Sequence, residues 1–129
     1  MNRAGTDRKD VIFVIDDNSE VLESVKKILQ REGYVVHTAH NPPDAIKLYE
    51  THWREINLVL LDFLMHVMRG DEVFERLQEI NPNVRAIVTT GCDDDAAEKM
   101  FQKGLRGFLQ KPYSPQELID RVRAEANSR

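Results

Sequence analysis

The sequence has one cysteine and no long apolar run. Cys92 can form no internal disulfide, and the four histidines show no zinc-type spacing with it. The opening residues are polar and charged and lack the apolar stretch of a signal peptide, and no later segment is long enough to span a bilayer. We therefore expect neither a disulfide nor a zinc scaffold, and we predict a soluble cytoplasmic protein without membrane insertion.

Basic charge is also scarce. Lysine and arginine number 18 against 22 aspartates and glutamates, which gives a net charge of −4, and the basic residues are scattered. This balance offers no electrostatic reason to bind nucleic acid or an anionic membrane. A Walker-type phosphate loop is missing as well, so nucleotide hydrolysis has no support in the sequence.

The chain does contain a repeated pattern in which a short apolar run precedes an amphipathic stretch. The 41% hydrophobic content of its 129 residues is enough to build one core. We expect a polar N-terminal tail over residues 1–9 and a single domain over 10–127. The predicted strands are residues 11–15, 34–39, 58–61, 84–90 and 107–110.

Each predicted strand leads into a predicted helix. Asp17 and Glu20 have capping-box spacing at the start of the first helix, as do Ser114 and Glu117 at the start of the last. The fourth helix follows a predicted loop at 91–95 and has the thinnest apolar stripe, which suits a movable element. Alternating strands and helices predict an α/β fold, doubly wound, with a five-stranded parallel sheet and helices on both faces.

Polar residues end several of the predicted strands. Parallel strands bring their carboxyl ends to one edge of the sheet, where ligands bind in folds of this class. Two carboxylates about 4 Å apart repel by about 4 kcal/mol at an effective dielectric constant of 20, so three of them need protons or a cation. Mg²⁺ prefers such oxygen ligands, and a lysine and a hydroxyl beside it would surround a phosphoryl group in transfer. The strand-end residues are Asp16, Asp17, Asp62, Thr90 and Lys111.

These residues resemble the receiver domain of bacterial response regulators and hybrid sensor kinases, over nearly the whole chain. The resemblance implies the flavodoxin-like (βα)5 receiver fold and a domain that catalyses its own phosphorylation and dephosphorylation. The family's marks are matched, in chain order, by Asp16-Asp17, by Asp62 in LVLLDFLM, by Thr90-Gly91 and by Lys111-Pro112.

The resemblance also implies roles for single residues. Asp62 is the phosphoacceptor, and its phosphoryl group comes from a histidine of a sensor histidine kinase or a histidine phosphotransfer domain. Thr90 and Lys111 contact the phosphoryl oxygens, the bond between Lys111 and Pro112 is cis, and Thr90 and Phe108 form the conformational switch. Phe108 has no hydroxyl, so its movement would depend on packing alone. The implied ligands of Mg²⁺ are Asp16 or Asp17, Asp62 and the backbone carbonyl of Leu64.

The sequence departs from the family in the loop after Asp62, and two further positions bear on the lifetime of the phosphorylated state. His66 stands where the family commonly has proline, and we assign it no role. Leu64 and Cys92 occupy positions that tune the lifetime of the phosphorylated state, and we hypothesise that these weakly polar residues hinder attack by water and lengthen it.

Other functions fit the sequence less well. A flavodoxin-like FMN carrier would need a Ser/Thr/Gly-rich loop after the first strand, and a haloacid-dehalogenase-type phosphatase would need an Asp-x-Asp nucleophile there; neither matches Asp16-Asp17-Asn18. A receiver used only as an interaction module stays open. The stretch GFLQKPYSPQEL resembles the receivers of hybrid histidine kinases, which leaves open whether the chain stands alone. The downstream partner and a homodimer are also left open.

Overall fold

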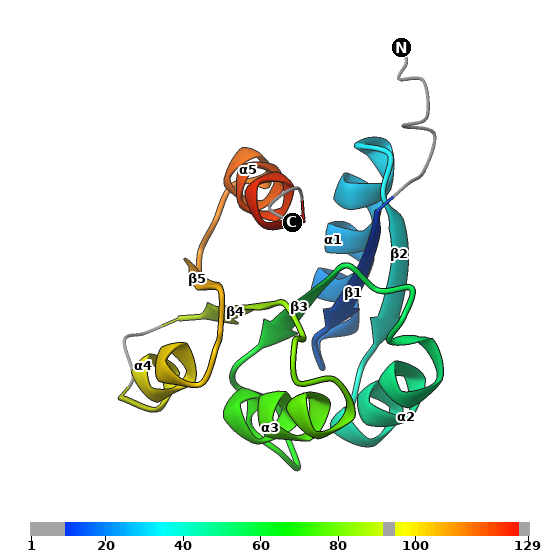
Figure 1. Ribbon diagram of the computed structural model, residues 1–129. Coiled ribbons are helices and arrows are strands. Elements are labelled where there is room, and N and C mark those ends of the chain that lie inside the picture. The colour runs from blue at the N-terminus through cyan, green and yellow to red at the C-terminus, as the bar shows by residue number, and fades with distance from the viewer. Residues whose placement is uncertain (1–9, 92–94, 127–129) are drawn as a thin grey trace.

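The computed structural model describes residues 10–91 and 95–126. The predicted tail over 1–9, Cys92 and residue 127 lie outside the described residues. Strands and helices alternate along the whole described chain, as expected (Figure 1). The elements are β1 (Val11–Ile15), α1 (Ser19–Arg31), β2 (Val35–Ala39), α2 (Pro42–His52), β3 (Leu58–Asp62), α3 (Gly70–Ile80), β4 (Ala86–Thr90), α4 (Asp95–Gln102), β5 (Gly107–Gln110) and α5 (Pro115–Ala126).

The strands form a five-stranded, fully parallel sheet in the order β2-β1-β3-β4-β5. Helices α1 and α5 cover one face, and α2, α3 and α4 cover the other (Figure 1). The strand order reverses beside β1, which pairs with both β2 and β3. The predicted doubly wound α/β fold is therefore confirmed, and the edge next to β1 and β3 is where such folds bind ligands.

Strand residues alternate between two hydrophobic cores because successive side chains point to opposite faces. Phe13 and Ile15 pack with α2 and α3, whereas Ile12 and Val14 pack with α1 and α5. Every residue of β3 and β4 is buried, including the polar ends of both strands. Burying each large aliphatic side chain contributes roughly 1.5–3 kcal/mol, so the central strands make a rigid base for the strand ends.

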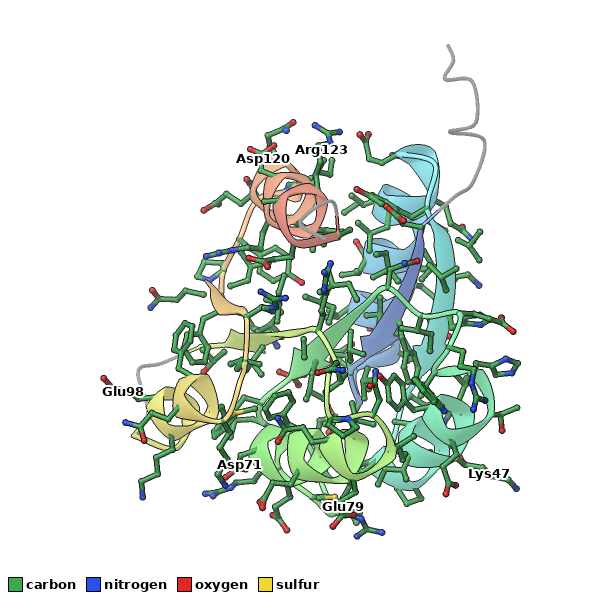
Figure 2. All side chains as sticks on the ribbon, in the orientation of Figure 1. Lys47, Asp71, Glu79, Glu98, Asp120 and Arg123 are labelled. Carbon is green, nitrogen blue, oxygen red and sulfur yellow. The ribbon has the colours of Figure 1, made fainter. Side chains whose placement is uncertain are left out.

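Many charged side chains lie on the outer faces of the helices. Charged side chains such as Lys47, Glu79 and Asp120 point away from the sheet (Figure 2). Arg123 on α5 reaches Glu32 after α1, with a nitrogen-to-oxygen distance of 2.8 Å. Among the described residues, no helix is long and apolar enough to cross a membrane.

The start of α1 differs from the prediction. Asn18, not Asp17, caps the helix, because its Oδ1 accepts hydrogen bonds from the backbone N–H groups of Glu20 at 3.0 Å and Val21 at 3.2 Å. At α5 the predicted capping box is confirmed. The Ser114 N–H donates to Glu117 Oε1 at 2.9 Å, and the Glu117 N–H donates to Ser114 Oγ at 3.1 Å.

Candidate functional site

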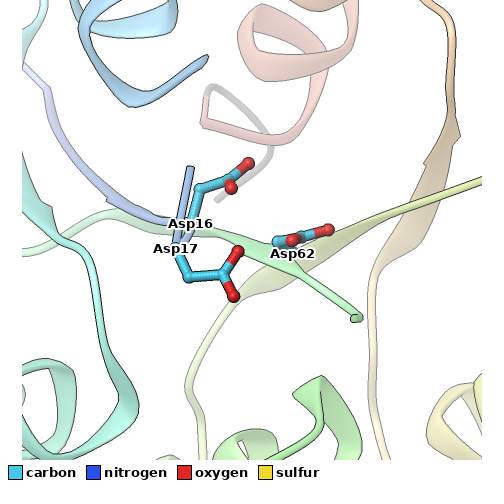
Figure 3. Close-up of side chains that lie close together, drawn as sticks. All are labelled: Asp16, Asp17 and Asp62. Carbon is cyan, nitrogen blue, oxygen red and sulfur yellow. The ribbon is translucent and has the colours of Figure 1, made fainter. Parts of the chain in front are cut away.

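Three aspartate side chains meet at the carboxyl ends of β1 and β3 (Figure 3). One carboxylate oxygen of each of Asp16, Asp17 and Asp62 lies within 4.8 Å of the others. Asp16 and Asp62 are only 5% and 6% exposed, and Asp17 is partly buried. Neighbouring parallel strands thus bring together carboxylates from distant parts of the sequence, as the strand-end pattern predicts.

Lys111, directly after β5, is the cation of this site. Its Nζ donates a hydrogen bond to Asp62 Oδ1 at 2.9 Å and lies 4.0 Å from Asp16 Oδ2. The Lys111 N–H also donates to the Thr90 carbonyl at 2.7 Å, which fixes the start of the loop after β5. The peptide bond between Lys111 and Pro112 is cis, as expected.

Burial and mutual repulsion change the acidity of the carboxylates. Burial raises the pKa of Asp16, and the Asp62 charge adds to this, although the Asn18 N–H bond opposes it. Burial likewise raises the pKa of Asp62 against the opposing hydrogen bond from Lys111. A single lysine therefore does not fully compensate the negative charge at this edge.

Asp17 behaves differently because the hydrogen bonds that it accepts from His66 stabilise its charged form. Burial acts to raise its pKa, but the backbone and side-chain hydrogen bonds from His66 outweigh that effect, and the pKa is lowered. The His66 N–H lies 3.1 Å from Asp17 Oδ2, and His66 Nδ1 lies 2.7 Å from the same oxygen. The sequence alone predicts no role for His66, although a histidine where the family commonly has proline marks this position as unusual.

The set of groups fits a divalent cation. Three carboxylates converge, and within residues 10–91 and 95–126 Lys111 is the one lysine or arginine that contacts them; oxygen ligands of this kind suit Mg²⁺. The Leu64 N–H hydrogen-bonds Asp62, so the loop after β3 closes against this carboxylate. The Leu64 side chain itself is 60% exposed.

Thr90 and Phe108 lie on the strands next to Asp62. Thr90 ends β4, is 7% exposed, and stands beside Thr89, which pairs with Asp62 in the sheet. Phe108 on β5 is half-buried, and its ring meets that of Phe101 on α4 edge-on, with centroids 4.6 Å apart. The structure thus connects β5 with α4 through an aromatic pair.

Fold and site together define a parallel α/β domain with an acidic, lysine-capped site at the ends of its strands. The model of the response regulator receiver domain family matches residues 12–123, and the chain belongs to this family. Receiver domains act in two-component systems, and the family's role is to take a phosphoryl group on an aspartate. They typically bind Mg²⁺ at an acidic pocket and interact with histidine kinases.

Individual relatives agree with this assignment. The chain is 30% identical over 114 residues to the transcriptional regulatory protein ResD of Bacillus subtilis, covering 88% of this chain and 46% of that protein. It is 27% identical over 113 residues to the sensor kinase CckA of Brucella abortus, covering 87% of this chain but 12% of the kinase. The chain thus spans less than half the length of either relative.

Solved structures show the same fold. A CheY-like receiver domain protein from Methanospirillum hungatei JF-1 superposes with a TM-score of 0.86 at 26% identity, covering 93% of this chain and 95% of that one. A receiver domain from Clostridium thermocellum gives the same TM-score and identity, covering 92% of this chain and 94% of that one.

Proposed function

We propose that Asp62 of this chain accepts a phosphoryl group from a phosphohistidine of a sensor histidine kinase or a histidine phosphotransfer domain. The observation that carries this proposal is the hydrogen bond of 2.9 Å from Lys111 Nζ to Asp62 Oδ1, inside a cluster of three carboxylates. An ammonium group in that place can neutralise charge that develops on the transferred group.

Asp62 is a better candidate for the acceptor than its two neighbours. Asp16 Oδ1 accepts the Asn18 N–H at 2.9 Å, and Asp17 Oδ2 accepts two hydrogen bonds from His66. Asp62 is the member of the cluster that lies closest to Lys111. Its carboxylate therefore combines a nucleophilic oxygen with the charge compensation that phosphoryl transfer needs.

In the proposed phosphoryl transfer, Asp62 is the nucleophile and the partner's histidine is the leaving group. An oxygen of Asp62 forms a bond to phosphorus while the bond from phosphorus to the partner's histidine nitrogen breaks, and the electron pair stays on that nitrogen. Lys111 and the Thr90 hydroxyl hold the phosphoryl oxygens. We propose Asp16, Asp17, Asp62 and the Leu64 carbonyl as ligands of Mg²⁺, which when bound supplies further positive charge.

A groove beside the site offers a surface on which the partner could dock. It has a volume of about 590 Å³ and lies between α1 and the loop after β5. Val21 and Ile28 of α1 and Tyr113 of the loop after β5 line it, and so does Lys111, which also bonds Asp62. Because the groove is continuous with the site through Lys111, we propose that it receives the apolar face of the partner's histidine-bearing helix.

We further propose that phosphorylation changes the surface at α4 and β5. Thr90 ends the strand next to Asp62, and Phe108 on β5 contacts Phe101 on α4. A phosphoryl group held by Thr90 and Lys111 would favour one arrangement of Phe101 and Phe108. The surface at α4 and β5 would then differ between the phosphorylated and the unphosphorylated chain.

The deciding experiment is intact-mass spectrometry after incubation with acetyl phosphate. We expect one added phosphoryl group on the native chain with Mg²⁺, none with EDTA, and none on Asp62→Asn. No adduct on the native chain, together with no Mg²⁺ binding, would instead favour an interaction module that is not phosphorylated.

A further inference from the structure

His66 connects the loop after β3 to the loop after β1. Its backbone N–H and its Nδ1 both contact Asp17 Oδ2, at 3.1 Å and 2.7 Å. The imidazole is 96% exposed, so packing does not hold it there. The hydrogen bonds to Asp17 are what fix this side chain.

The backbone after His66 is in an uncommon conformation. Val67 has a φ of 76°, and the Met68 N–H donates to the His66 carbonyl at 2.8 Å. This is the γ-turn with positive φ, a rare and strained form, and a β-branched residue is especially disfavoured in it. Val67 is 86% exposed, so no burial of its side chain stabilises the turn.

Anchors on both sides therefore hold the strained turn. On one side His66 bonds Asp17, and on the other the Gly70 N–H donates to the Phe63 carbonyl at 2.7 Å. Conformational strain persists where the surrounding structure over-determines it, and such places cluster at functional sites. Here the anchor on the His66 side is a proposed metal ligand.

We propose that His66 is a positioning residue for the divalent cation. This inference rests on the proposed function, because it takes Asp17 as a ligand. By holding Oδ2, His66 keeps the other oxygen of Asp17 for the ion; Figure 3 shows one Asp17 oxygen directed toward Asp16 and Asp62 and the other directed away. Hydrogen bonds to metal-ligating carboxylates fix their orientation and tune metal affinity.

The coupling works in both directions. An ion that holds Asp17 in this orientation also favours the His66 contact, and through it the turn at Val67. The hydrogen bond from His66 Nδ1 to Asp17 needs a proton on Nδ1. The imidazole carries that proton in one of its two neutral tautomers and also in its charged form. Metal occupancy would therefore stabilise the loop between β3 and α3.

The test is a Mg²⁺ titration of the intact chain, followed by NMR at one fixed pH. We expect His66→Ala to weaken Mg²⁺ binding by about two- to fivefold, the order of one modest hydrogen bond at an exposed site. His66→Asn keeps an N–H donor near the position of Nδ1 and should recover most of that loss. The Met68 amide signal should shift on Mg²⁺ addition in the native chain and less in His66→Ala.

A double-mutant cycle separates positioning from a general effect on the loop. If His66 acts through Asp17, His66→Ala should weaken Mg²⁺ binding less in an Asp17→Asn background than in the native one. Equal or tighter binding by His66→Ala, or no recovery in His66→Asn, would overturn the inference. A native chain that binds no Mg²⁺ at all would overturn the proposed metal site itself, so the two failures are distinguishable.

Discussion

Lys111 Nζ and Asp62 Oδ1 lie 2.9 Å apart and join the ends of β5 and β3 across the intervening β4. The Lys111 backbone is itself fixed, because its N–H donates to the Thr90 carbonyl at 2.7 Å. The ammonium group therefore reaches Asp62 from an anchored point at the edge of the sheet. A lysine held in this way can compensate the negative charge of Asp62 and then that of a phosphoryl group bound to it.

Replacing this lysine should mainly affect phosphoryl transfer. We expect Lys111→Met to lower the rate of phosphorylation by acetyl phosphate by about 100-fold, the order found when one preorganised donor is removed from a site of developing charge. The rate is measured by intact mass over time. Lys103→Met is the matched control, since Lys103 contacts Glu75 at 3.7 Å on the surface and should leave the rate unchanged.

The pKa directions predict how stability depends on pH without metal. The pKa of Asp16 is raised in the folded chain by burial, first of all, and also by Asp62. Its folded pKa exceeds its unfolded one, so its contribution is fully present below the unfolded pKa, near 3.8, and is lost as pH rises through the folded pKa. At pH 7 the charge on Asp16 therefore destabilises the fold.

Removing that charge should stabilise the metal-free chain. We expect Asp16→Asn to raise the free energy of unfolding at pH 7 by about 1 kcal/mol. Burial and the repulsion from Asp62 outweigh the attraction of Lys111 at 4.0 Å, and unit charges within 4.8 Å interact by about 1 kcal/mol at the dielectric constant of water. Urea denaturation with EDTA measures this, and the gain should vanish near pH 3. Asp17→Asn is the control, and we expect it to lower the free energy of unfolding at pH 7. The lowered pKa of Asp17 means that the fold stabilises its charged form. A loss of stability in Asp16→Asn at pH 7 would contradict the expectation.

The strand-end residues could be predicted from the sequence because parallel strands place their ends at one edge whatever their separation in the chain. The helix cap at Asn18 could not, because Asp17 is also a good capping residue and only side-chain geometry decides between them. The contact between His66 and Asp17 spans 49 positions and joins two loops, so no local pattern indicates it. The start of β4 was also predicted too early. Val84 donates its N–H to the Asn81 carbonyl and so belongs to the preceding turn.

Gly70 allows the loop after β3 to return close under Asp62. A Cβ at this position would lie 2.8 Å from the Phe63 Cα and 2.9 Å from the Asp62 carbonyl oxygen, both backbone atoms that cannot rotate away. We expect Gly70→Ala to lower the free energy of unfolding by about 2–3 kcal/mol, the upper range for overpacking. It should also slow phosphorylation, because the backbone that carries Asp62 must shift.

Gly91→Ala is the matched control for that substitution. A Cβ on Gly91 would meet nothing within 4 Å, so the change in stability should stay within about 0.5 kcal/mol. Urea denaturation of the two variants side by side measures the difference. Equal stabilities would mean that the close approach beneath Asp62 relaxes without cost.

The strain at Val67 predicts a stabilising substitution. Val67 has a φ of 76° and is 86% exposed, so glycine would remove an unfavourable backbone conformation and lose almost no burial. The relief is of order 1–3 kcal/mol. The greater flexibility of glycine in the unfolded chain offsets roughly 0.5–1 kcal/mol of it. We expect Val67→Gly to raise the free energy of unfolding by about 1 kcal/mol in urea denaturation. Val35→Gly is the control: Val35 is 41% exposed in a regular strand and should lose stability, whereas losses in both variants would mean that Val67 carries no strain.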